Sequence, residues 1–296
     1  MTMLSICIPI YRYSVRPLIQ ALQKEITGFR LPCQLVCADD GSDDDTLSRN
    51  AFLEEDPTIH YDLLPANIGR AAIRNHLARQ SKYPFLLFMD ADVMPVHPDF
   101  IRKYLSSLDP GALLYGGTTY FSQPPSDPAK RFHWRYGKAK EEVPVSRRNQ
   151  QEYRTFKTNN FVIPKAIVEK HPLDEQLQGY GHEDSLLARE CALSGIPIRH
   201  LDNPVLHLGL EDQPVLLAKL ENSLDNLYEL YLRNELPDTP LQVVFRPGPV
   251  RWLSGQLRAL LPTLHRKLAA EPDINMALLD LYKLLYLNRL QEKDAP

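Results

Sequence analysis

The eight residues Phe85-Leu86-Leu87-Phe88-Met89-Asp90-Ala91-Asp92 decide the fold of this chain. Five consecutive apolar residues followed by acids are typical of a strand buried on both faces of a sheet. Period-2 alternation would place Asp90 and Asp92 on the same side of an extended backbone. Two carboxylates that close repel each other unless a cation lies between them, and Mg²⁺ or Mn²⁺ suits such oxygen ligands. For an isolated triplet, a solvated turn or a helix N-cap is the better interpretation.

Alternating elements surround this strand. Strands are predicted at 4–10, 34–38, 59–64 and 85–89, and helices at 15–27, 46–54, 70–81 and 98–108, with Ser14 as the N-cap and Gly28 as the end of the first helix. This order predicts an α/β fold with a mostly parallel sheet, helices on both faces and ligands at the carboxyl ends of the strands. Further strands are predicted at 155–163 and 196–208, and a helix at 185–193.

The domain organisation follows from where this alternation stops. The α/β pattern covers residues 1–210, in a first half at 1–115 and a second half at 116–210, and helical patterns fill the extension 211–296. Residues 123–152 are rich in proline and charge, which predicts a functional loop or lid. Between Lys130 and Lys157, nine Lys or Arg stand against three Glu, so this stretch is either a solvated charged loop or a mobile lid whose Trp134 could stack on a ligand.

Composition excludes several classes of protein. The net charge of -3 and the pI of about 6.3 give no reason to expect nucleic acid as a partner. The four cysteines show no metal-site spacing and suit a reducing compartment. The N-terminal residues make a poor signal peptide, and no apolar run approaches the roughly 20 residues of a membrane span. We therefore expect a cytoplasmic protein.

Two more polar clusters follow predicted strands. Carboxylates of the segment Asp39-Asp40-Gly41-Ser42 can accept hydrogen bonds from a base or a ribose, and an Asx-turn that caps the next helix is an equal alternative. Arg70 and Arg74 lie one turn apart at the start of a helix, where phosphate binds readily, unless both are simply solvated. Tyr11, at the end of the first strand, could stack on a base or pack in the core.

The later part of the chain carries further acids and a histidine. Glu183 and Asp184 occupy the first turn of a predicted helix, where the macrodipole favours their ionised form and simple capping is the alternative. His207 ends a predicted strand and is either a core residue or a ligand for Mn²⁺ beside two carboxylates.

Taken in order, these motifs resemble glycosyltransferase family 2, which has the GT-A fold, a Rossmann-like nucleotide-diphospho-sugar transferase fold. The resemblance covers roughly residues 3 to 210. The segments that carry it are 5–11 (SICIPIY), 38–42 (ADDGS), 67–75 (NIGRAAIRN), 89–92 (MDAD), 159–161 (NNF) and 179–184 (GYGHED). Arg12 stands where many relatives have asparagine.

The resemblance implies roles for individual residues. It implies a nucleotide site, a metal site for Mn²⁺ or Mg²⁺, a general base and a region that borders the sugar or the acceptor. The implied nucleotide-binding residues are Pro9, Tyr11, Asp39, Asp40, Arg70, Arg74 and Asp90. The implied metal ligands are Asp90, Asp92 and His207. The implied base is Asp184, with Glu183 as the second choice, and the sugar or acceptor region contains Asn159, Asn160, Trp134, Tyr180 and Gly181.

We therefore expect a metal-dependent enzyme that moves a sugar from a nucleoside diphosphate donor, a UDP-sugar, to a hydroxyl of a glycan or a lipid-linked acceptor. The resemblance also implies inversion of the sugar and a role in polysaccharide or glycoconjugate synthesis. The alternatives are a nucleotidyltransferase, although the chain lacks its glycine-rich N-terminal loop, and a non-catalytic carbohydrate-binding relative. Residues 251–268 form a basic amphipathic segment that either packs onto the catalytic domain or associates peripherally with the inner face of a membrane.

Overall fold

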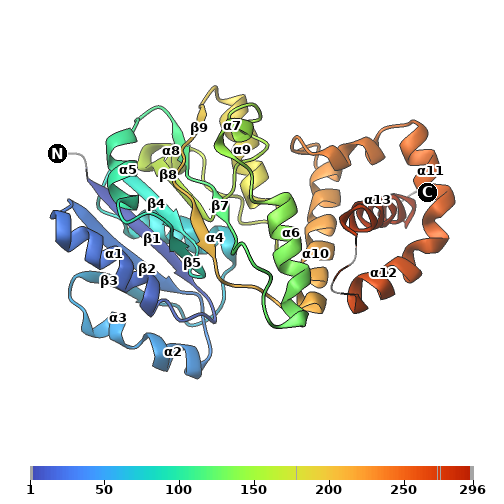
Figure 1. Ribbon diagram of the computed structural model, residues 1–296. Coiled ribbons are helices and arrows are strands. Elements are labelled where there is room, and N and C mark those ends of the chain that lie inside the picture. The colour runs from blue at the N-terminus through green and yellow to red at the C-terminus, as the bar shows by residue number, and fades with distance from the viewer. Residues whose placement is uncertain (1–2, 178, 272, 274, 294–296) are drawn as a thin grey trace. The chain divides into compact units, whose positions relative to one another are not determined.

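The computed structural model describes residues 3–177, 179–271, 273 and 275–293 (Figure 1). The chain divides into two compact units. We call the first the α/β unit; it takes the described residues of Met1–Tyr120, Glu142–Gln176 and Glu183–Gly209. The second, the helical unit, takes those of Phe121–Glu141, Leu177–His182 and Leu210–Pro296. The chain passes repeatedly from one unit to the other.

A seven-stranded sheet with the order β3-β2-β1-β4-β8-β6-β9 forms the centre of the α/β unit (Figure 1). The first four strands are parallel to one another, as are β6 and β9, while β8 runs antiparallel to both of its neighbours. The mixed α/β class and the mostly parallel sheet are therefore confirmed. The strands are β1 (Leu4–Ile10), β2 (Cys33–Asp39), β3 (Ile59–Leu63), β4 (Phe85–Met89), β6 (Leu113–Tyr115), β8 (Asn160–Pro164) and β9 (Ile198–His200).

The side chains of β4 explain why the sheet is covered on both faces. Phe85, Leu87 and Met89 belong to one apolar cluster, whereas Leu86 and Phe88 belong to another. All five are buried, because successive side chains of a strand point to opposite faces and helices cover both. Helices α1 and α5 contribute to the first cluster, and α4, α8 and α9 contribute to the second.

The helices of the α/β unit largely follow the predicted periodicity. The first helix is the exception at its ends: Val15 rather than Ser14 is its N-cap, and it runs through Gly28 until Arg30 adopts a left-handed conformation with φ 50°. The predicted helix at 46–54 is broken into two at Ala51. The helices are α1 (Arg16–Phe29), α2 (Asp44–Asn50), α3 (Phe52–Glu55), α4 (Arg70–Gln80), α5 (Phe100–Ser107), α7 (Val145–Arg148), α8 (Lys165–Lys170) and α9 (Glu183–Leu193).

A second, three-stranded sheet has the order β5-β10-β7. Its strands are β5 (Val93–Pro95), β7 (Thr118–Thr119) and β10 (Val205–His207). β10 pairs antiparallel with β5, and their register places His207 opposite Val93. Because β5 starts just after the acidic triplet, this pairing brings His207 next to that triplet. β6 and β7 lie where the sequence shows no clear pattern and were not predicted.

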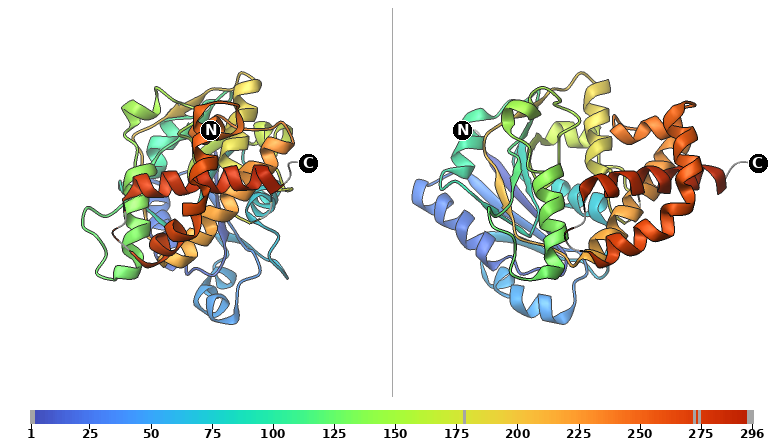
Figure 2. Two further views of the ribbon diagram at one scale, coloured as in Figure 1. Left: turned by 90° about the vertical axis from the view of Figure 1, so that its right-hand side faces the viewer. Right: turned by 45° about the vertical axis from the view of Figure 1, so that its right-hand side comes forward.

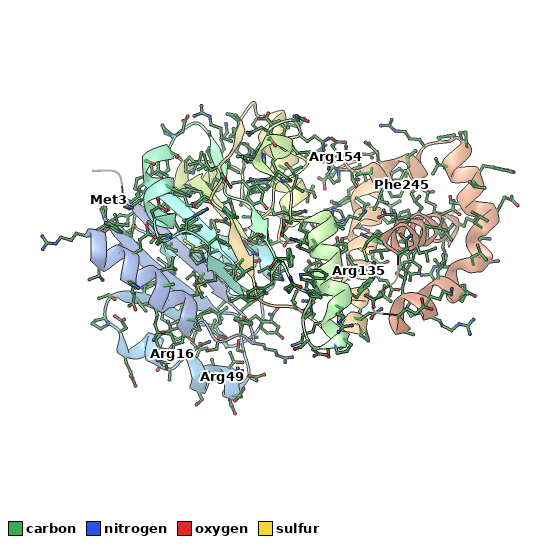
Figure 3. All side chains as sticks on the ribbon, viewed as in Figure 1. Met3, Arg16, Arg49, Arg135, Arg154 and Phe245 are labelled. Carbon is green, nitrogen blue, oxygen red and sulfur yellow. The ribbon has the colours of Figure 1, made fainter. Side chains whose placement is uncertain are left out.

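The helical unit contains the helix pattern predicted beyond residue 213. Its helices are η1 (Pro128–Lys130), α6 (Arg131–Lys140), α10 (Gln213–Leu232), η2 (Pro240–Phe245), α11 (Pro249–Leu257), η3 (Arg258–Leu260), α12 (Leu261–Ala270) and α13 (Met276–Lys293). Figure 2 shows α13, in red, lying across the orange helices, and it contacts α10, α11, α12 and η2. Phe245, labelled in Figure 3, is part of the apolar core of this unit. The predicted loop at 123–152 is wrong in part, because it contains α6 and α7.

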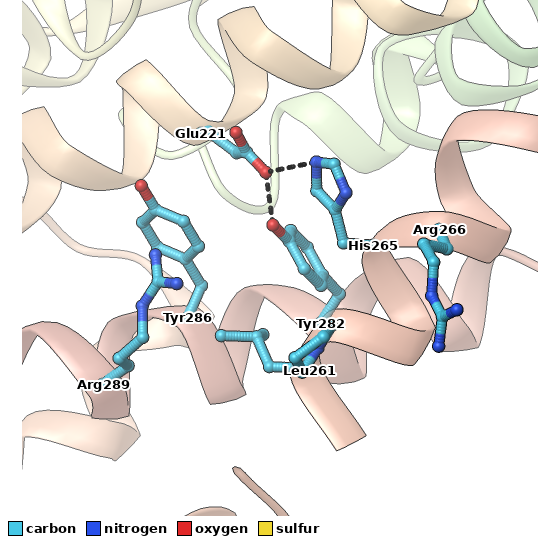
Figure 4. Close-up of a pocket in the computed structure, with 8 residues that line it drawn as sticks. Glu221, Leu261, His265, Arg266, Tyr282, Tyr286 and Arg289 are labelled. Atoms are coloured by element: carbon cyan, nitrogen blue, oxygen red, sulfur yellow. Dashed lines mark hydrogen bonds and ion pairs between the residues drawn. The ribbon is translucent and has the colours of Figure 1, made fainter. Parts of the chain in front are cut away.

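A cavity of about 420 Å³ lies among α10, α12 and α13 (Figure 4). The Tyr282 hydroxyl donates to Glu221 Oε1, and His265 Nε2 lies 3.4 Å from that same oxygen. The Tyr286 hydroxyl donates to Asp225 Oδ1 at 3.0 Å, and burial together with that carboxylate raises the pKa of Tyr286 to about 12. The acids of this region therefore hold α13 and α12 to α10.

Among the described residues, no helix is long and apolar enough to cross a membrane.

Candidate active site

Two arginines of α4 hold the first acid of the triplet. Arg74 is 2% exposed; its guanidinium donates to Asp90 Oδ1, and it also donates to the Arg70 carbonyl oxygen at 3.0 Å. The other Asp90 oxygen lies 3.8 Å from Arg70 NH2. The Asp90 backbone N–H donates to the Asn159 carbonyl oxygen at 3.1 Å, which fixes the end of β4. Asp90 is thus an anchored carboxylate whose charge is already compensated.

Arg70 also reaches the predicted base region. Its Nε donates to Glu183 Oε1 at 2.6 Å, and the Glu183 side chain is only 8% exposed. One guanidinium therefore connects the end of β4 with the first turn of α9, two places that lie 93 residues apart in the sequence. A guanidinium can bind two carboxylates because its five N–H groups point in fixed and different directions.

The second acid of the triplet faces a different partner. β4 ends at Met89 and Ala91-Asp92 form a turn, so the extended alternation predicted for the triplet does not continue to Asp92. His207 Nδ1 lies 3.8 Å from Asp92 Oδ1, and the Leu208 N–H donates to the Asp92 carbonyl oxygen at 2.8 Å. Burial raises the pKa of Asp92 and the nearby Asp90 charge adds to that increase, while His207 opposes it.

Gly209 permits this arrangement. A Cβ atom at position 209 would lie 2.0 Å from Asp92 Oδ2, a distance that two nonbonded atoms cannot adopt. The requirement for glycine here is therefore one of space around a carboxylate rather than of backbone conformation. The ring of Tyr120 packs edge-on against His207, with ring centroids 5.3 Å apart.

Asp184 occupies the same first turn of α9 as Glu183 but has other contacts. Lys157 Nζ donates to Asp184 Oδ2 at 2.6 Å, and the backbone N–H of Ser185 donates to Oδ1 at 2.7 Å. The Asp184 side chain is 13% exposed and that of Lys157 is 40% exposed. The two neighbouring acids are thus held by different cations, one an arginine and the other a lysine.

In the segment Asp39-Asp40-Gly41-Ser42, one carboxylate holds the backbone, and the other has an oxygen without a hydrogen-bond partner among the described residues. Both Asp40 oxygens accept backbone N–H groups, from Ile68 at 2.7 Å and from Gly69 at 3.2 Å, so Asp40 anchors the loop before α4. Burial raises the pKa of Asp40 despite these bonds. Asp39 accepts from the Ser42 N–H at 2.7 Å through Oδ1, and its buried Oδ2 has no hydrogen-bond partner among the described residues.

Tyr11 and Pro9 lie at the carboxyl end of β1. Tyr11 is 46% exposed, and the Arg12 guanidinium lies 5.1 Å from the centre of its ring. Arg12 adopts a left-handed conformation with φ 50°, and its N–H donates to Ser42 Oγ at 2.8 Å. Pro9 is half-buried and stands next to Ala38 in the register of β1 and β2. The Tyr11 ring is therefore available to a ligand rather than packed in the core.

The two asparagines at the start of β8 differ sharply. Asn160 is fully buried and its side chain bonds to three groups: Oδ1 accepts from the Tyr104 hydroxyl at 2.7 Å, and Nδ2 donates to the carbonyl oxygens of Gly117 and Asn203, both at 2.9 Å. Asn159 donates to Thr118 Oγ1 at 2.7 Å, and its Oδ1 is buried without a hydrogen-bond partner among the described residues. Asn160 therefore supports the site, and Asn159 offers it an acceptor.

Three residues of the implied acceptor region belong to the helical unit. Trp134 lies on α6, and its indole N–H donates to the Phe121 carbonyl oxygen at 2.8 Å. Tyr180 donates its backbone N–H to Asn222 Oδ1 at 2.5 Å. Gly181 has φ +98°, and a Cβ there would lie 2.6 Å from Ser223 Oγ. The segment before Glu183 is thus fixed to α10 within its own unit.

The structure adds two residues that the motifs did not reveal. Lys157 was one of many cations in a charged stretch, and only the fold shows that it pairs with Asp184, 27 residues away. Gly209 follows a strand, where a glycine usually marks a turn, and its proximity to Asp92 depends on the pairing of β5 and β10. Neither pairing leaves a signal in the local sequence.

The donor groups fit a divalent cation in type. Carboxylate oxygens and a neutral imidazole suit Mn²⁺, and Mg²⁺ accepts carboxylates together with waters and phosphate oxygens. Asp92 and His207 already face each other. Among the described residues, no group of three His, Cys, Asp or Glu side chains is placed to hold a metal ion. A cation here would therefore take its remaining ligands from water and from a phosphate-bearing substrate.

Comparison with known proteins identifies the family. The sequence model described as Glycosyl transferase family 2 matches residues 5–175, which is more than half of the chain. The chain belongs to glycosyl transferase family 2, and it is a glycosyltransferase. The match contains β1 to β4, both acids of the triplet and the two asparagines, but it ends before Glu183. A search of proteins with curated descriptions finds no match.

Solved structures with the same fold agree with this assignment. Residues 1–349 of TarS from S. aureus are 15% identical, with a TM-score of 0.53 over 99% of this chain and 92% of that one. The mannosyltransferase PcManGT from Pyrobaculum calidifontis is 14% identical, with a TM-score of 0.55 over 96% and 86%. Glucosyl-3-phosphoglycerate synthase from Mycobacterium tuberculosis is 16% identical, with a TM-score of 0.52 over 80% and 82%. At these identities the likeness shows the fold, which is GT-A.

Proposed function

We propose that this glycosyltransferase moves a sugar from a nucleoside diphosphate donor, a UDP-sugar, to a hydroxyl of a glycan or a lipid-linked acceptor. Structures of similar fold have been determined with UDP-GlcNAc, with GDP-Man and Mn²⁺, and with UDP and Mn²⁺. The observation that supports the proposal is the Asp90–Arg70–Glu183 connection, because one guanidinium links Asp90, which we propose faces the donor, with Glu183, the neighbour of the proposed base. Such a reaction would serve polysaccharide or glycoconjugate synthesis.

The nucleotide would bind at the carboxyl ends of β1 and β2. The exposed Tyr11 ring can stack on the base next to Pro9, and the unpartnered Asp39 Oδ2 can accept a base N–H. Asp40 would act indirectly, since both of its oxygens already hold the loop that leads to Arg70. Arg70 is 38% exposed at its side chain and can offer N–H groups to the diphosphate, whereas the buried Arg74 keeps Asp90 in place.

Asp92 and His207, with Asp90 behind them, would hold the Mn²⁺ or Mg²⁺ ion. The bound ion supplies positive charge against the departing diphosphate. Asp92 follows the carboxyl end of β4, where ligands of parallel sheets bind. Because Gly209 has no side chain, the Asp92 carboxylate would have room to turn toward a cation. The Tyr120 ring would keep the His207 imidazole oriented.

Asp184 would act as the general base. It accepts the proton of the acceptor hydroxyl while the acceptor oxygen forms a bond to the anomeric carbon, and the bond from that carbon to the diphosphate oxygen breaks. The electron pair leaves with the nucleoside diphosphate, whose charge Arg70 helps to stabilise. One displacement of this kind inverts the anomeric centre. Glu183 would position Arg70, because its carboxylate is already committed to that guanidinium.

The donor sugar and the acceptor need polar and aromatic neighbours. The buried Asn159 Oδ1 can accept a hydroxyl of the donor sugar, and Asn160 would keep it in place from the core. On the helical unit, Trp134, Tyr180 and Gly181 are the proposed acceptor-binding residues. Aromatic rings suit this role because they stack on the apolar faces of sugars.

We also propose a cytoplasmic location, which the four free thiols support, since disulfides are rare in that compartment. Burial raises the pKa of Cys7 to about 12, so that this thiol stays protonated and unreactive. A lipid-linked acceptor would bring the chain to the inner face of a membrane, and the basic segment 251–268 suits a peripheral association there.

A donor screen tests the proposal directly. The full chain is incubated with Mn²⁺ and a panel of nucleotide sugars, with and without glycan acceptors, and release of nucleoside diphosphate is measured. Release with one donor and product of inverted configuration by NMR would support it. Release of pyrophosphate from a sugar phosphate and a nucleoside triphosphate would instead indicate a nucleotidyltransferase. Binding of saccharides without turnover would indicate a non-catalytic relative.

A further inference from the structure

Residues 240–270 have an unusual charge composition. This stretch contains five Lys or Arg and no Asp or Glu, although the whole chain has 34 basic and 37 acidic residues. It forms η2, α11, η3 and α12 of the helical unit. A segment of 31 residues with the average acidic content of this chain would contain about four acids, so the local field of these helices is distinctly positive.

The apolar residues of the same segment fall into two groups. Leu261, Leu264 and Leu268 of α12 are buried in the core of the helical unit. Trp252 and Leu253 of α11 are instead 68% and 51% exposed, and Leu260 of η3 is 46% exposed. The predicted amphipathic segment therefore packs Leu257, Leu261, Leu264 and Leu268 against the core of its own unit, while Trp252 and Leu253 remain exposed.

The exposed apolar residues of α11 share one side of the helix. At 100° per residue, Trp252, Gln256 and Leu253 lie within an arc of about 100°. Ser254, which is 3% exposed, points to the opposite side, where α11 contacts α13. A tryptophan and a leucine side by side on an exposed helical face are more than the scattered apolar residues of an ordinary surface.

The segment 240–270 that contains this face also carries exposed cations. Arg251 stands next to Trp252 in the sequence, and Arg246, Arg266 and Lys267 are also exposed. None of these four forms an ion pair with any residue that the structure describes. Arg258 is the exception, because it pairs with Glu292. Their charges therefore remain available to an external anion.

Three acids of the helical unit have other partners in the structure. In the helical unit Glu221 and Asp225 accept hydrogen bonds from Tyr282 and Tyr286, and Asp280 pairs with Lys140. A positive surface with an exposed tryptophan suits the interface of an anionic bilayer, where the indole ring lies at the headgroup level and guanidinium groups meet phosphates. Attraction of this kind acts over about 10 Å, so the cations need not touch one headgroup together.

We propose that Trp252, Leu253 and Leu260, with Arg251, Arg266 and Lys267, form a docking surface for an anionic phospholipid bilayer. The apolar side chains enter the interfacial region, and the basic side chains supply the electrostatic attraction. This inference deepens the peripheral association proposed above by naming its residues and its lipid. It requires no glycosyl transfer, so that a failure of one proposal leaves the other standing.

The test measures binding of the full chain to vesicles in a low-salt buffer. Vesicles of phosphatidylcholine alone are compared with an equal mixture of phosphatidylcholine and phosphatidylglycerol by co-sedimentation. The chain has two tryptophans, so Trp134→Phe leaves Trp252 as the sole fluorescent reporter. Binding to the mixed vesicles alone, with a shift of Trp252 emission to shorter wavelength, is the expected result.

Variants separate the apolar and the electrostatic contributions. Trp252→Ser with Leu253→Ser is expected to weaken vesicle binding at least about tenfold. Arg251→Gln, Arg266→Gln and Lys267→Gln together are expected to weaken it about 100-fold, since each cation near such a surface contributes about fivefold. These residues are exposed, so circular dichroism should show an unchanged fold.

Matched controls lie on the α/β unit. Leu193 is 68% exposed, like Trp252, and Leu193→Ser should leave vesicle binding unchanged. The triple variant Lys24→Gln, Arg79→Gln, Lys82→Gln removes three exposed cations elsewhere and should also bind normally. The proposal is overturned if the wild type does not co-sediment with the mixed vesicles, or if the control variants lose as much vesicle binding as the variants of the docking surface. It is also overturned if Trp252 emission shifts with protein concentration alone, because a second copy of the chain would then cover this face.

Discussion

The roles proposed for Asp184 and Glu183, at the start of α9, can be distinguished by one conservative substitution of each residue. Asp184→Asn removes the proposed base but keeps a side chain of the same shape, and Glu183→Gln removes the charged partner of Arg70. Asp184 touches Lys157 and its own helix turn, whereas Glu183 is bonded to Arg70. The two variants should therefore fail in different kinetic parameters.

The contacts set the size of each effect. Loss of a general base lowers kcat by about 10²- to 10⁴-fold, and Asp184→Asn should leave the KM for the donor nearly unchanged because Asp184 pairs with Lys157, whereas Arg70 pairs with Asp90 and Glu183. Glu183→Gln weakens a charged hydrogen bond to a guanidinium whose side chain is 38% exposed. At about 1.5 kcal/mol, the low end for such bonds, it should raise the KM for the donor about tenfold.

The assay measures initial rates of nucleoside diphosphate release while the donor concentration is varied at saturating acceptor. Glu190→Gln is the matched control, because Glu190 lies on the same helix and its carboxylate accepts from the neighbouring Arg189. A larger loss of kcat in Glu183→Gln than in Asp184→Asn would refute the assignment of the base. Equal effects of both variants on kcat and KM would show that the acids work as one unit.

Three further substitutions test the supports of the site. Gly209→Ala places a methyl group against the Asp92 carboxylate, so the Mn²⁺ concentration for half-maximal rate should rise about tenfold while the thermal midpoint stays nearly constant; an unchanged Mn²⁺ requirement would contradict this. Asn160→Leu removes the side-chain donor to the carbonyl oxygens of Gly117 and Asn203 and the acceptor of the Tyr104 hydroxyl, and should lower the free energy of unfolding in urea by about 3 kcal/mol; a loss below about 1 kcal/mol would count against it. Burial lowers the pKa of His200 from 6.5 to about 4. Between these two pH values His200 takes up a proton only in the unfolded state. This residue should therefore cost the wild type about 3 kcal/mol of its free energy of unfolding as the pH falls from about 6.5 to 4. Urea titrations across this pH range should show that the free energy of unfolding of His200→Gln changes less with pH than that of the wild type. If both change equally, His200 is not the cause of the pH dependence.

The sequence predicts the α/β unit well where a single element carries the whole signal. β4 is five apolar residues long and buried on both faces, so its pattern needs no knowledge of its neighbours. The order of β1 to β4 and the helices between them follows from the same local periodicity. Their parallel pairing is then almost obligatory, because the connecting helices return the chain to the same edge.

Elements held by distant contacts were missed. α6 has a narrow buried face with Phe132, His133 and Gly137, too little to stand out among prolines and charges. Its ion pairs, Arg135 with Asp273 and Lys140 with Asp280, span 138 and 140 residues. Short helices owe most of their stability to such packing rather than to propensity, so local sequence could not have revealed this one.

The candidate site, too, could be predicted only where the signal is local in the sequence. The types of residue and their positions at strand ends could be predicted, but their partners could not. Asp40 was a sound candidate for a ligand-binding acid until the fold placed two backbone N–H groups, from Ile68 and Gly69, on its oxygens. Asp39 is the one with an oxygen that has no hydrogen-bond partner among the described residues. In an acidic motif, the fold decides which carboxylate supports the backbone and which remains available.

The same reasoning gives the two acids of the triplet separate tasks. The charge of Asp90 is compensated by the two arginines Arg74 and Arg70, so an added cation would gain little from binding to this carboxylate. Asp92 lies 3.8 Å from the His207 ring, and Arg70 adds a smaller favourable interaction, so its charge is less fully compensated and attracts a cation more strongly. We infer that Asp92 makes the principal contact with the metal, while Asp90 fixes Arg70 in the position from which it meets both the diphosphate and Glu183. On this view the triplet is useful because its two carboxylates differ in their partners, and the turn at Ala91 is what separates them.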